Sequence, residues 1–600
     1  MFVGIVGDEV TSRSGEALLT SCPTAKTYYH YSGTEERWFP DRGRGILRAM
    51  KASRRRKTLA AFCLRTLSLV WLVAVTAHAD CTLTNLGLTP LNEFGFKNYS
   101  NYAAGLYPNG SNTRPPAHEA AGLAIAQAIQ PLDAAGNIDT NAGKIVLLSL
   151  GMSNTTQEWA SKGTNHFTRL ATTDPSLNPR VRIVDGAIGG QDATTWTNAN
   201  AATWATVITQ RLVQAGVTTN QVQVLWLKQA LAGPRNYGNF PLHAQALQNH
   251  LAIILRIART KYPNLKLAYL STRTRAYTAT PTDLNPEPFA FETSFADKWV
   301  IEDQIVGQNN LNFDGAKGPV VAPWISWGPY IWADGLVPRG DGFTWLCSDT
   351  ESDFTHPSPT GGVPKVAQQL LAFFKTDPTT TPWFLKKSGA GGPTVAPTGS
   401  ATNGVLPLTV NFAANASLGS APFHDGQWTF EDGEFATNAN PTKIFRSPGI
   451  YHARVTVTDT NGNIAQGVVA VTVNGTYELW AAGKFTPTEF TNAAISGYAA
   501  NPDGDSYANL LEYALGREPK ISDGKTFPTL TLTGGVATLT YPHLKAAADV
   551  ALSLQVSSDL TNWTNTTPAS VLDGGAIETI TVSEAVAANS ARYFRLRALK

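Results

Sequence analysis

Apolar positions in the first half of the chain follow two alternating patterns. Continuous apolar runs, typical of strands buried on both faces of a parallel sheet, occur at residues 144–151, 181–190, 222–230 and 265–273. Amphipathic stretches suited to helices lie between and after them, at residues 203–216, 242–262 and beyond His356. This alternation predicts a three-layer α/β domain with a parallel sheet, which we place at residues 80–387.

The pattern changes after residue 387. A stretch rich in Gly, Pro and Ser predicts a linker at residues 388–400. Short alternating strands separated by turn residues predict an Ig-like β-sandwich at residues 401–475. A helical segment at residues 476–523 and a small, mainly β domain at residues 524–600 complete the multidomain chain.

An export signal is predicted near the N-terminus. Residues 50–79 combine basic residues, an apolar run and the sequence Ala77-His-Ala79, as a secretory signal peptide and its cleavage site do. A membrane anchor is the alternative, although the apolar run is short for a span. Residues 1–49 are then an upstream extension that comes from an over-long gene prediction. The mature protein is expected to be secreted, periplasmic or on the cell surface, without a stable membrane span.

The distribution of charge along the chain argues against a nucleic-acid partner. The net charge of the 600 residues is +2, but residues 1–79 hold 12 Lys and Arg against 6 Asp and Glu, so residues 80–600 carry −4. A nucleic-acid partner would need a basic patch, and this mildly acidic body argues against one. The oligomeric state stays open.

Two cysteines, Cys81 and Cys347, remain after the signal peptide. An even number in an exported chain predicts a disulfide between them, with two unpaired buried thiols as the alternative.

Polar residues that suit catalysis follow the predicted strands. Ser153 enters a helix after the first strand, Gly190 follows the second and Gln229 ends the third, while Asp353 and His356 precede the last helix. Ligands bind at the carboxyl edge of open α/β sheets, so these residues are expected to meet there. Taken singly, each has a structural alternative: Ser153 as a helix cap, Gly190 in an ordinary turn, Gln229 as a solvated amide, and Asp353 and His356 as polar loop residues.

This order of residues resembles the SGNH (GDSL-like) serine hydrolases over about 300 residues. Gly151-Met-Ser153 is similar to their first block, Gly190 to the second and Asp353-Phe-Thr-His356 to the last. Met152 stands where the family usually has Asp, and Lys228-Gln229 replaces the Gly-x-Asn-Asp block.

The resemblance implies a serine esterase without a catalytic cofactor. Ser153 attacks an acyl carbonyl, His356 moves the proton, Asp353 orients His356, and the N–H groups of Ser153 and Gly190, with Gln229, bind the oxyanion. The expected substrate is an acyl ester, foremost an acetyl ester, on carbohydrate. A non-catalytic carbohydrate-binding or adhesion protein built on a degenerate hydrolase domain is the alternative, and a lipase is a third reading.

Aromatic residues precede Asp353. Trp324, Trp327, Trp332 and Trp345 are predicted to stack on sugar rings of the substrate, with packing in the core as the alternative.

Residues 426–463 resemble a PKD (polycystic kidney disease) domain. The likeness lies in Trp428-x-Phe-x-Asp432-Gly433, in Pro448-Gly449-x-Tyr451 and in the strand that ends at Asp459. It implies the sandwich fold and a role as a spacer or polysaccharide-contacting module.

The C-terminal module contains an EF-hand or dockerin-like loop, in which Ser506 replaces the usual Gly. Ligand positions 1, 3, 5, 7, 9 and 12 of a structural Ca²⁺ site fall on Asn501, Asp503, Asp505, Tyr507, Asn509 and Glu512. An Asx-rich turn that caps the next helix is the alternative.

Overall fold

The computed structural model describes residues 2–5, 9–11, 81–278, 284–523, 528–587 and 590–600. The predicted signal peptide lies outside these residues, as does most of the predicted upstream extension. Of the extension, β1 (Phe2–Ile5) and β2 (Glu9–Thr11) are described, and both pair in parallel with β26 (Ala591–Leu599). Within the described ranges, no helix has both the length and the apolar character that a membrane span requires.

The predicted parallel sheet is confirmed. Its strands run in the order β6-β5-β7-β8-β9, and every neighbouring pair is parallel. They are β5 (Ile145–Gly151), β6 (Val181–Asp185), β7 (Val222–Lys228), β8 (Leu267–Leu270) and β9 (Trp324–Trp327). All seven residues of β5 and of β7 are buried, as their continuous apolar runs predict.

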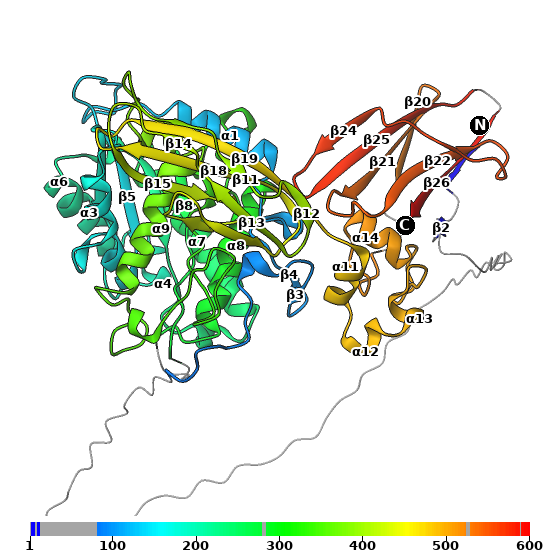
Figure 1. The fold of residues 1–600 in the computed structure, drawn as a ribbon, viewed down its shortest axis with the longest axis horizontal. Helices are drawn as coiled ribbons and strands as arrows, with labels where there is room; N and C mark the ends of the chain where they lie inside the picture. The colour runs from blue at the N-terminus through cyan, green and yellow to red at the C-terminus, as the bar shows by residue number, and fades with distance from the viewer. Residues whose placement is uncertain (1, 6–8, 12–80, 279–283, 524–527, 588–589) are drawn as a thin grey trace, which may run out of the picture. The chain divides into compact units, whose positions relative to one another are not determined.

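Helices cover both faces of this sheet (Figure 1). The α-helices of this domain are α1 (Pro116–Gln127), α2 (Ser153–Thr156), α3 (Phe167–Thr173), α4 (Ala193–Trp196), α5 (Ala202–Thr206), α6 (Leu212–Gln214), α7 (Leu242–Lys261), α8 (Phe289–Ile305), α9 (Gly362–Thr376) and α10 (Thr381–Phe384). A short hairpin of β3 (Asn98–Tyr99) and β4 (Tyr102–Ala103) precedes them.

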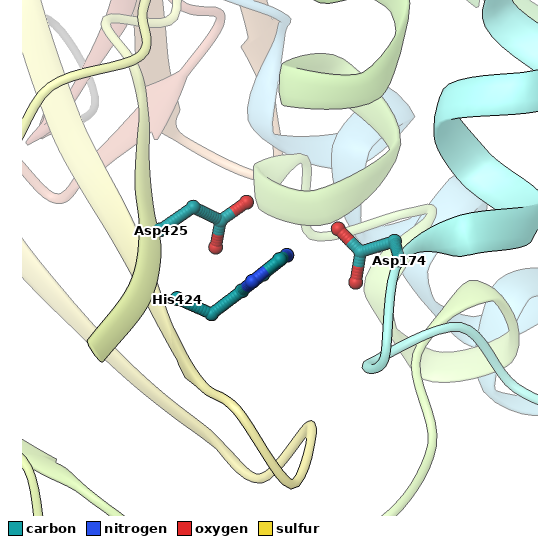
Figure 2. Close-up of side chains that lie close together, drawn as sticks. All are labelled: Asp174, His424 and Asp425. Carbon is teal, nitrogen blue, oxygen red and sulfur yellow. The ribbon is translucent and has the colours of Figure 1, made fainter. Parts of the chain in front are cut away.

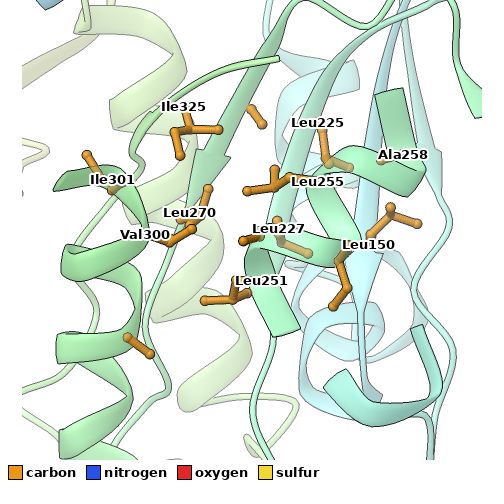
Figure 3. Close-up of a cluster of buried hydrophobic side chains, with 14 of the residues drawn as sticks. Leu150, Leu225, Leu227, Leu251, Leu255, Ala258, Leu270, Val300, Ile301 and Ile325 are labelled. Atoms are coloured by element: carbon orange, nitrogen blue, oxygen red, sulfur yellow. The ribbon is translucent and has the colours of Figure 1, made fainter. Parts of the chain in front are cut away.

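The alternation of side chains along β5 divides the core into two layers. Val146, Leu148 and Leu150 belong to the layer that includes α7 and α8, whereas Ile145 and Leu147 belong to the layer that includes α3 and α9. Figure 3 shows the first layer, in which Leu251 and Leu255 of α7 and Val300 and Ile301 of α8 meet Leu150, Leu225, Leu227 and Leu270 of the strands. Each such side chain stabilises the fold by about 1.5–3 kcal/mol through burial.

The predicted β-sandwich consists of two sheets. One has the order β11-β13-β17 and the other β12-β19-β18-β15-β16, with β10 paired to β14 beside them. The strands are β10 (Thr394–Val395), β11 (Thr398–Gly399), β12 (Asn403–Val405), β13 (Leu408–Ala413), β14 (Ala416–Ser417), β15 (Phe423–Thr429), β16 (Phe435–Ala436), β17 (Thr442–Phe445), β18 (Gly449–Asp459) and β19 (Ile464–Asn474). Their inward residues form one core around Phe412, Trp428 and Val455.

The sandwich begins earlier than the sequence pattern predicts. Strands β10 and β11 lie within residues 388–400, the stretch that we expected to be a linker, and they pair with β14 and β13. Short two-residue strands carry too few alternating positions to be distinguished from a Gly- and Pro-rich linker.

The C-terminal module combines helices and strands. It contains α11 (Tyr477–Lys484), α12 (Pro487–Phe490), α13 (Ala493–Ser496), α14 (Asn509–Leu515), β20 (Thr529–Thr533), β21 (Val536–Leu544), β22 (Ala551–Ser557), β23 (Thr564–Asn565), β24 (Ser570–Asp573), β25 (Ile577–Ala585) and β26. Trp480 and Leu511 of the helices share one core with Leu539 and Phe594 of the strands. The helical segment and the β segment, which we expected as separate regions, therefore pack as one unit.

The predicted disulfide between Cys81 and Cys347 is confirmed, with the two Cα atoms 5.6 Å apart. It joins residues that are 266 positions apart in the sequence. The bond ties the start of the α/β domain to the segment just before Asp353.

A buried lysine links the α/β domain to the sandwich. The Lys375 ammonium of α9 lies 2.7 Å from Asp174 of the α/β domain and 2.7 Å from Asp425 of β15. Figure 2 shows His424 and Asp425 pointing toward Asp174, a grouping of side chains that also suits a metal ion. Because the Lys375 ammonium already pairs with both carboxylates, we interpret the group as an ion-pair contact between domains.

Replacing this lysine is expected to destabilise the protein strongly. Lys375→Met leaves the Asp174 carboxylate buried without its cation, and breaking a buried pair in this way costs about 3–5 kcal/mol. Chemical denaturation of the variant measures the loss. The matched control is Lys520→Met, because Lys520 pairs with Glu489 at the surface and should contribute at most about 1 kcal/mol. Equal losses in the two variants would contradict the interpretation.

Candidate active site and calcium loop

Two of the candidate residues flank the point where the strand order of the sheet reverses. From β5 the chain passes to β6 on one side and then to β7 on the other. In sheets with this strand order, ligands bind at the carboxyl ends of the strands beside that switch point. Ser153 lies two residues beyond β5, and Gln229 directly follows β7.

Ser153, His356 and Asp353 form a chain of hydrogen bonds. The Ser153 Oγ and the His356 Nε2 are 2.6 Å apart. On the other side of the ring, the His356 Nδ1 contacts the Asp353 Oδ2. The structure thus joins Ser153 to a histidine that lies 203 positions later in the sequence, with a base beside a hydroxyl and a carboxylate behind the base. This arrangement can activate the hydroxyl as a nucleophile.

The loop around Asp353 keeps its carboxylate ionised. Asp353 Oδ1 accepts hydrogen bonds from the backbone N–H of Thr355 at 3.2 Å and of His356 at 3.0 Å. Partial burial acts to raise the pKa of Asp353, but the hydrogen bonds from the side chain and backbone of His356 and from Thr355 outweigh it. The pKa of Asp353 therefore lies well below its usual value, and the group is an anion at neutral pH.

Two residues that the sequence patterns did not single out hold the histidine loop in place. The Asn154 Nδ2 donates to the carbonyl oxygen of Thr355 at 2.9 Å, and the Arg273 Nη2 donates to its Oγ1 at 2.9 Å. Asn154 adjoins Ser153, and Arg273 follows β8 at the same edge of the sheet. Their positions at that edge were the only signal in the sequence, because both bonds depend on contacts more than 80 residues away.

The predicted oxyanion residues lie on the two neighbouring turns. A Cβ built on Gly189 would lie 3.8 Å from the Cβ of Ser153, so the segment of Gly189 and Gly190 runs beside the hydroxyl-bearing residue. Gly190 has a φ of +73°, a backbone conformation that favours glycine. The side chain of Gln229 is 1% exposed, and neither its Nε2 nor its Oε1 has a hydrogen-bond partner among the described residues. The alternative, in which Gln229 is a solvated loop amide, is thereby excluded.

The triad lies near the surface. The side chain of His356 is 17% exposed and that of Asp353 is 46% exposed. A bulky substrate can therefore approach these residues from solvent.

The four tryptophans expected to bind sugar are core residues, which corrects that expectation. Each ring is at most 2% exposed, so no face is open to a ligand. Their indole N–H groups donate to the protein itself: to carbonyl oxygens in Trp324, Trp327 and Trp345, and to the Glu287 carboxylate in Trp332. Although these tryptophans lie close to His356 in the sequence, they do not line the surface of the site.

The predicted calcium loop brings several acidic groups together. Carboxylate oxygens of Asp503, Asp505 and Glu512 lie within 4.8 Å of one another. In the described part of the chain, both oxygens of the fully buried Glu512 lack a hydrogen-bond partner, as do one oxygen each of Asp503, Asp505 and Asn509. Oxygen atoms free of hydrogen bonds suit a hard cation such as Ca²⁺.

Two other predicted ligands also take part in the packing of the loop and the module. The Asn501 side chain accepts from the N–H of Gly504 and donates to the carbonyl of Asp505, which shapes the loop. The ring of Tyr507 packs in the core of the module, as a residue that offers only its backbone carbonyl can do.

Asp523 extends the acidic group beyond the loop. Burial and the nearby Asp505 and Asp503 raise the pKa of Asp523, and its Oδ1 has no hydrogen-bond partner among the described residues. Burial and the same two aspartates raise the pKa of Glu512 to about 9. The sequence motif missed Asp523 because it lies 11 residues after the last loop position.

Comparison with known proteins identifies the sandwich. Residues 392–473 match the family model of the PKD domain. These residues form a PKD domain. Two solved structures resemble it: the PKD1 domain of the Vibrio cholerae metalloprotease PrtV, at 23% identity, and the PKD1 domain of Vibrio anguillarum Epp, at 18%. Each match covers 14% of this chain, with 96% and 93% of the other chain and a TM-score of 0.13 in both cases.

Longer stretches of the chain resemble solved structures only distantly. An extracellular lipase from Streptomyces rimosus aligns over 38% of this chain and 99% of its own, with 11% identity and a TM-score of 0.22. No curated protein matches the chain. The PKD domain is thus identified by its family model, whereas the role of the α/β domain rests on its geometry.

Proposed function

We propose that this protein is an exported serine esterase that removes acyl groups, foremost acetyl groups, from carbohydrate. The observation that carries the proposal is the chain of contacts from Ser153 through His356 to Asp353. Its place at the switch point of a parallel sheet supports the same reading.

The reaction proceeds in two steps through an acyl-enzyme. The Ser153 Oγ attacks the ester carbonyl while the His356 Nε2 takes its proton, and the tetrahedral intermediate expels the sugar hydroxyl, which receives that proton. Water, deprotonated by His356, then attacks the acyl-enzyme, and the acid is released as His356 returns that proton to the Ser153 Oγ. Asp353 stabilises the imidazolium in both steps.

The oxyanion of each intermediate needs hydrogen-bond donors. The backbone N–H groups of Ser153 and Gly190 are two such donors in the proposal, and the Gln229 Nε2 is the third. The unpartnered, buried amide of Gln229 supports this role, because a buried amide normally has a partner in the folded protein.

The nature of the substrate is argued from the surroundings of the site. The exposure of His356 and Asp353 suits an ester displayed on a large molecule, since a deep pocket would restrict access. The attached PKD domain suits an extracellular protein that works on polysaccharide. The alternative is a binding protein with a degenerate hydrolase domain, in which Ser153 and His356 have no need to remain 2.6 Å apart.

Removal of the nucleophile or the base should abolish hydrolysis. In assays of the full chain with p-nitrophenyl acetate and acetylated polysaccharide, Ser153→Ala and His356→Ala should each lower kcat/KM by about 10³-fold or more. The control variants Ser161→Ala and His166→Ala change a serine and a histidine outside the hydrogen-bond chain and should keep full activity. A wild-type protein that binds acetylated polysaccharide but turns over neither substrate would favour the alternative.

Gln229 offers a test of the oxyanion role. Gln229→Met keeps the side-chain volume but removes the amide, so kcat should fall by about 10²–10³-fold, as with other oxyanion donors. Its melting temperature should not fall, because the amide makes no hydrogen bond to the described residues in the free protein. An unchanged kcat would show that the amide has another role.

We further propose that the C-terminal loop binds Ca²⁺ through Asp503, Asp505, Asn509 and Glu512, with Tyr507 contributing its carbonyl and Asp523 an additional carboxylate. The support is the set of buried oxygens without hydrogen-bond partners among the described residues. The ion stabilises the module and takes no part in the esterase chemistry.

The stabilisation by Ca²⁺ should increase with pH. Since the pKa of Glu512 is raised to about 9 in the folded protein without metal, the folded state holds a proton that the unfolded state loses above about pH 4.5. Stability in EDTA should therefore fall as pH rises from 5 to 9, whereas Ca²⁺ replaces the proton and removes this dependence. Melting temperatures at pH 6 and pH 8.5, with Ca²⁺ or EDTA, measure the effect. Glu512→Gln should abolish the response to Ca²⁺, and a response that persists would place the ion elsewhere.

A further inference from the structure

We propose that the buried ion pair of Lys228 and Glu158 is a positioning element of the active site, which holds the strand that leads to Gln229 against the turn that carries Ser153. This inference rests on the proposed esterase function. It assigns a role to two residues for which the family resemblance implies none.

The pair joins two segments that both lead into the site. Lys228 is the last residue of β7, directly before Gln229, and Glu158 lies five residues after Ser153 in the π-helical segment Gln157–Ser161. The Lys228 Nζ is 2.6 Å from both carboxylate oxygens of Glu158. Both side chains are fully buried. Their contact therefore fixes the distance between the Gln229 segment and the Ser153 segment.

A second contact acts in parallel at the backbone of the same lysine. The Thr155 Oγ1 donates to the carbonyl oxygen of Lys228 at 2.8 Å. Lys228 also lies opposite Gly151 in the strand register. A Cβ on Gly151 would clash with both Thr155 and the Lys228 carbonyl, so only glycine permits this close approach.

The energetics favour a role in positioning over a role in stability. Two buried charges lose their hydration, and an apolar pair of similar volume is often equally stable or more stable. Because of this desolvation, burial raises the pKa of Glu158 and lowers that of Lys228. Such a pair adds little net stability but restricts the geometry of the residues around it. We therefore explain it by its effect on the positions of the nucleophile and the Gln229 amide.

Other charged groups face the pair. Arg273 and Asp297 both interact electrostatically with Lys228. Glu158 interacts electrostatically with His356.

The test is the double variant Lys228→Met/Glu158→Gln in the full chain, which removes both charges together, so that neither charge is left buried without its counter-ion. Displacement of reacting groups by about 1 Å costs on the order of 10²-fold. We expect kcat for p-nitrophenyl acetate to fall by about 30- to 100-fold with KM within about 3-fold of wild type. The control is His243→Gln/Glu292→Gln, which removes another buried pair, 2.7 Å apart, between α7 and α8, and should leave kcat within about 3-fold at temperatures below its melting point.

The outcomes separate this inference from the proposed function. If wild type and Ser153→Ala are equally inactive, the proposed function fails. If wild type is active and the double variant keeps kcat within 3-fold, the inference is wrong. An equal loss of kcat in the control would also overturn the inference, because removal of any buried pair would then lower kcat to the same extent.

A second variant covers the case in which the double variant does not fold. Thr155→Val conserves shape and removes only the hydrogen bond to the Lys228 carbonyl. We expect kcat to fall by about 10-fold at constant KM. The reason is that the variant loses a hydrogen bond worth about 1 kcal/mol, and this bond sets the geometry of the site. Unchanged kcat in this folded variant would contradict the inference.

Discussion

The close contact between Gly151 and the main chain of Lys228 is the constraint on which the candidate site depends. It is possible because Gly151 has no Cβ, and it places the turn after β5 against the end of β7. Ser153 and Gln229 follow these two residues, so both lie at the switch point of the sheet. The loop of Asp353 and His356 then reaches the same place, held by Asn154 and Arg273 through Thr355. A shift of β7 along β5 by one residue would disrupt all of these contacts together.

The PKD domain contributes to the same structure through buried polar contacts. The Asn92 side chain of the α/β domain donates to the Glu434 carboxylate, and the backbone N–H of Asp341 donates to the same group. The Lys375 ammonium and the hydrogen bond from Thr456 to the Lys375 carbonyl add contacts on α9, the helix that follows His356. Directional bonds of this kind specify one arrangement of two surfaces, which a flexible spacer would not need. We therefore regard the PKD domain as a support of the α/β domain in addition to any contact with polysaccharide.

The sequence predicted those features that depend on local spacing. Continuous apolar runs marked the parallel strands, and the short interval between Asp353 and His356 marked the loop that bears them. The Cys81–Cys347 pairing followed from counting, because only two cysteines remained. The roles of Lys228, Glu158 and Arg273 could not be predicted from the sequence, because they depend on strand register and on residues far away in sequence. The four tryptophans misled for a related reason: aromatic side chains are equally suited to a sugar site and to a core, and only the fold decides which face is covered.

Two predicted sites share a physical signature that no sequence motif contains. The Gln229 amide and the Glu512 carboxylate are both buried, and neither has a hydrogen-bond partner among the described residues. Leaving such groups unpaired costs about 1–3 kcal/mol each, and more for a charged group. A fold tolerates this cost where a ligand later supplies the missing partner. The oxyanion of an ester intermediate is the matching partner for an amide donor, and a divalent cation is the matching partner for clustered carboxylates. The polarity of each unpaired group therefore agrees with the chemistry proposed for its site, although the two sites lie in different parts of the chain and were inferred from unrelated motifs.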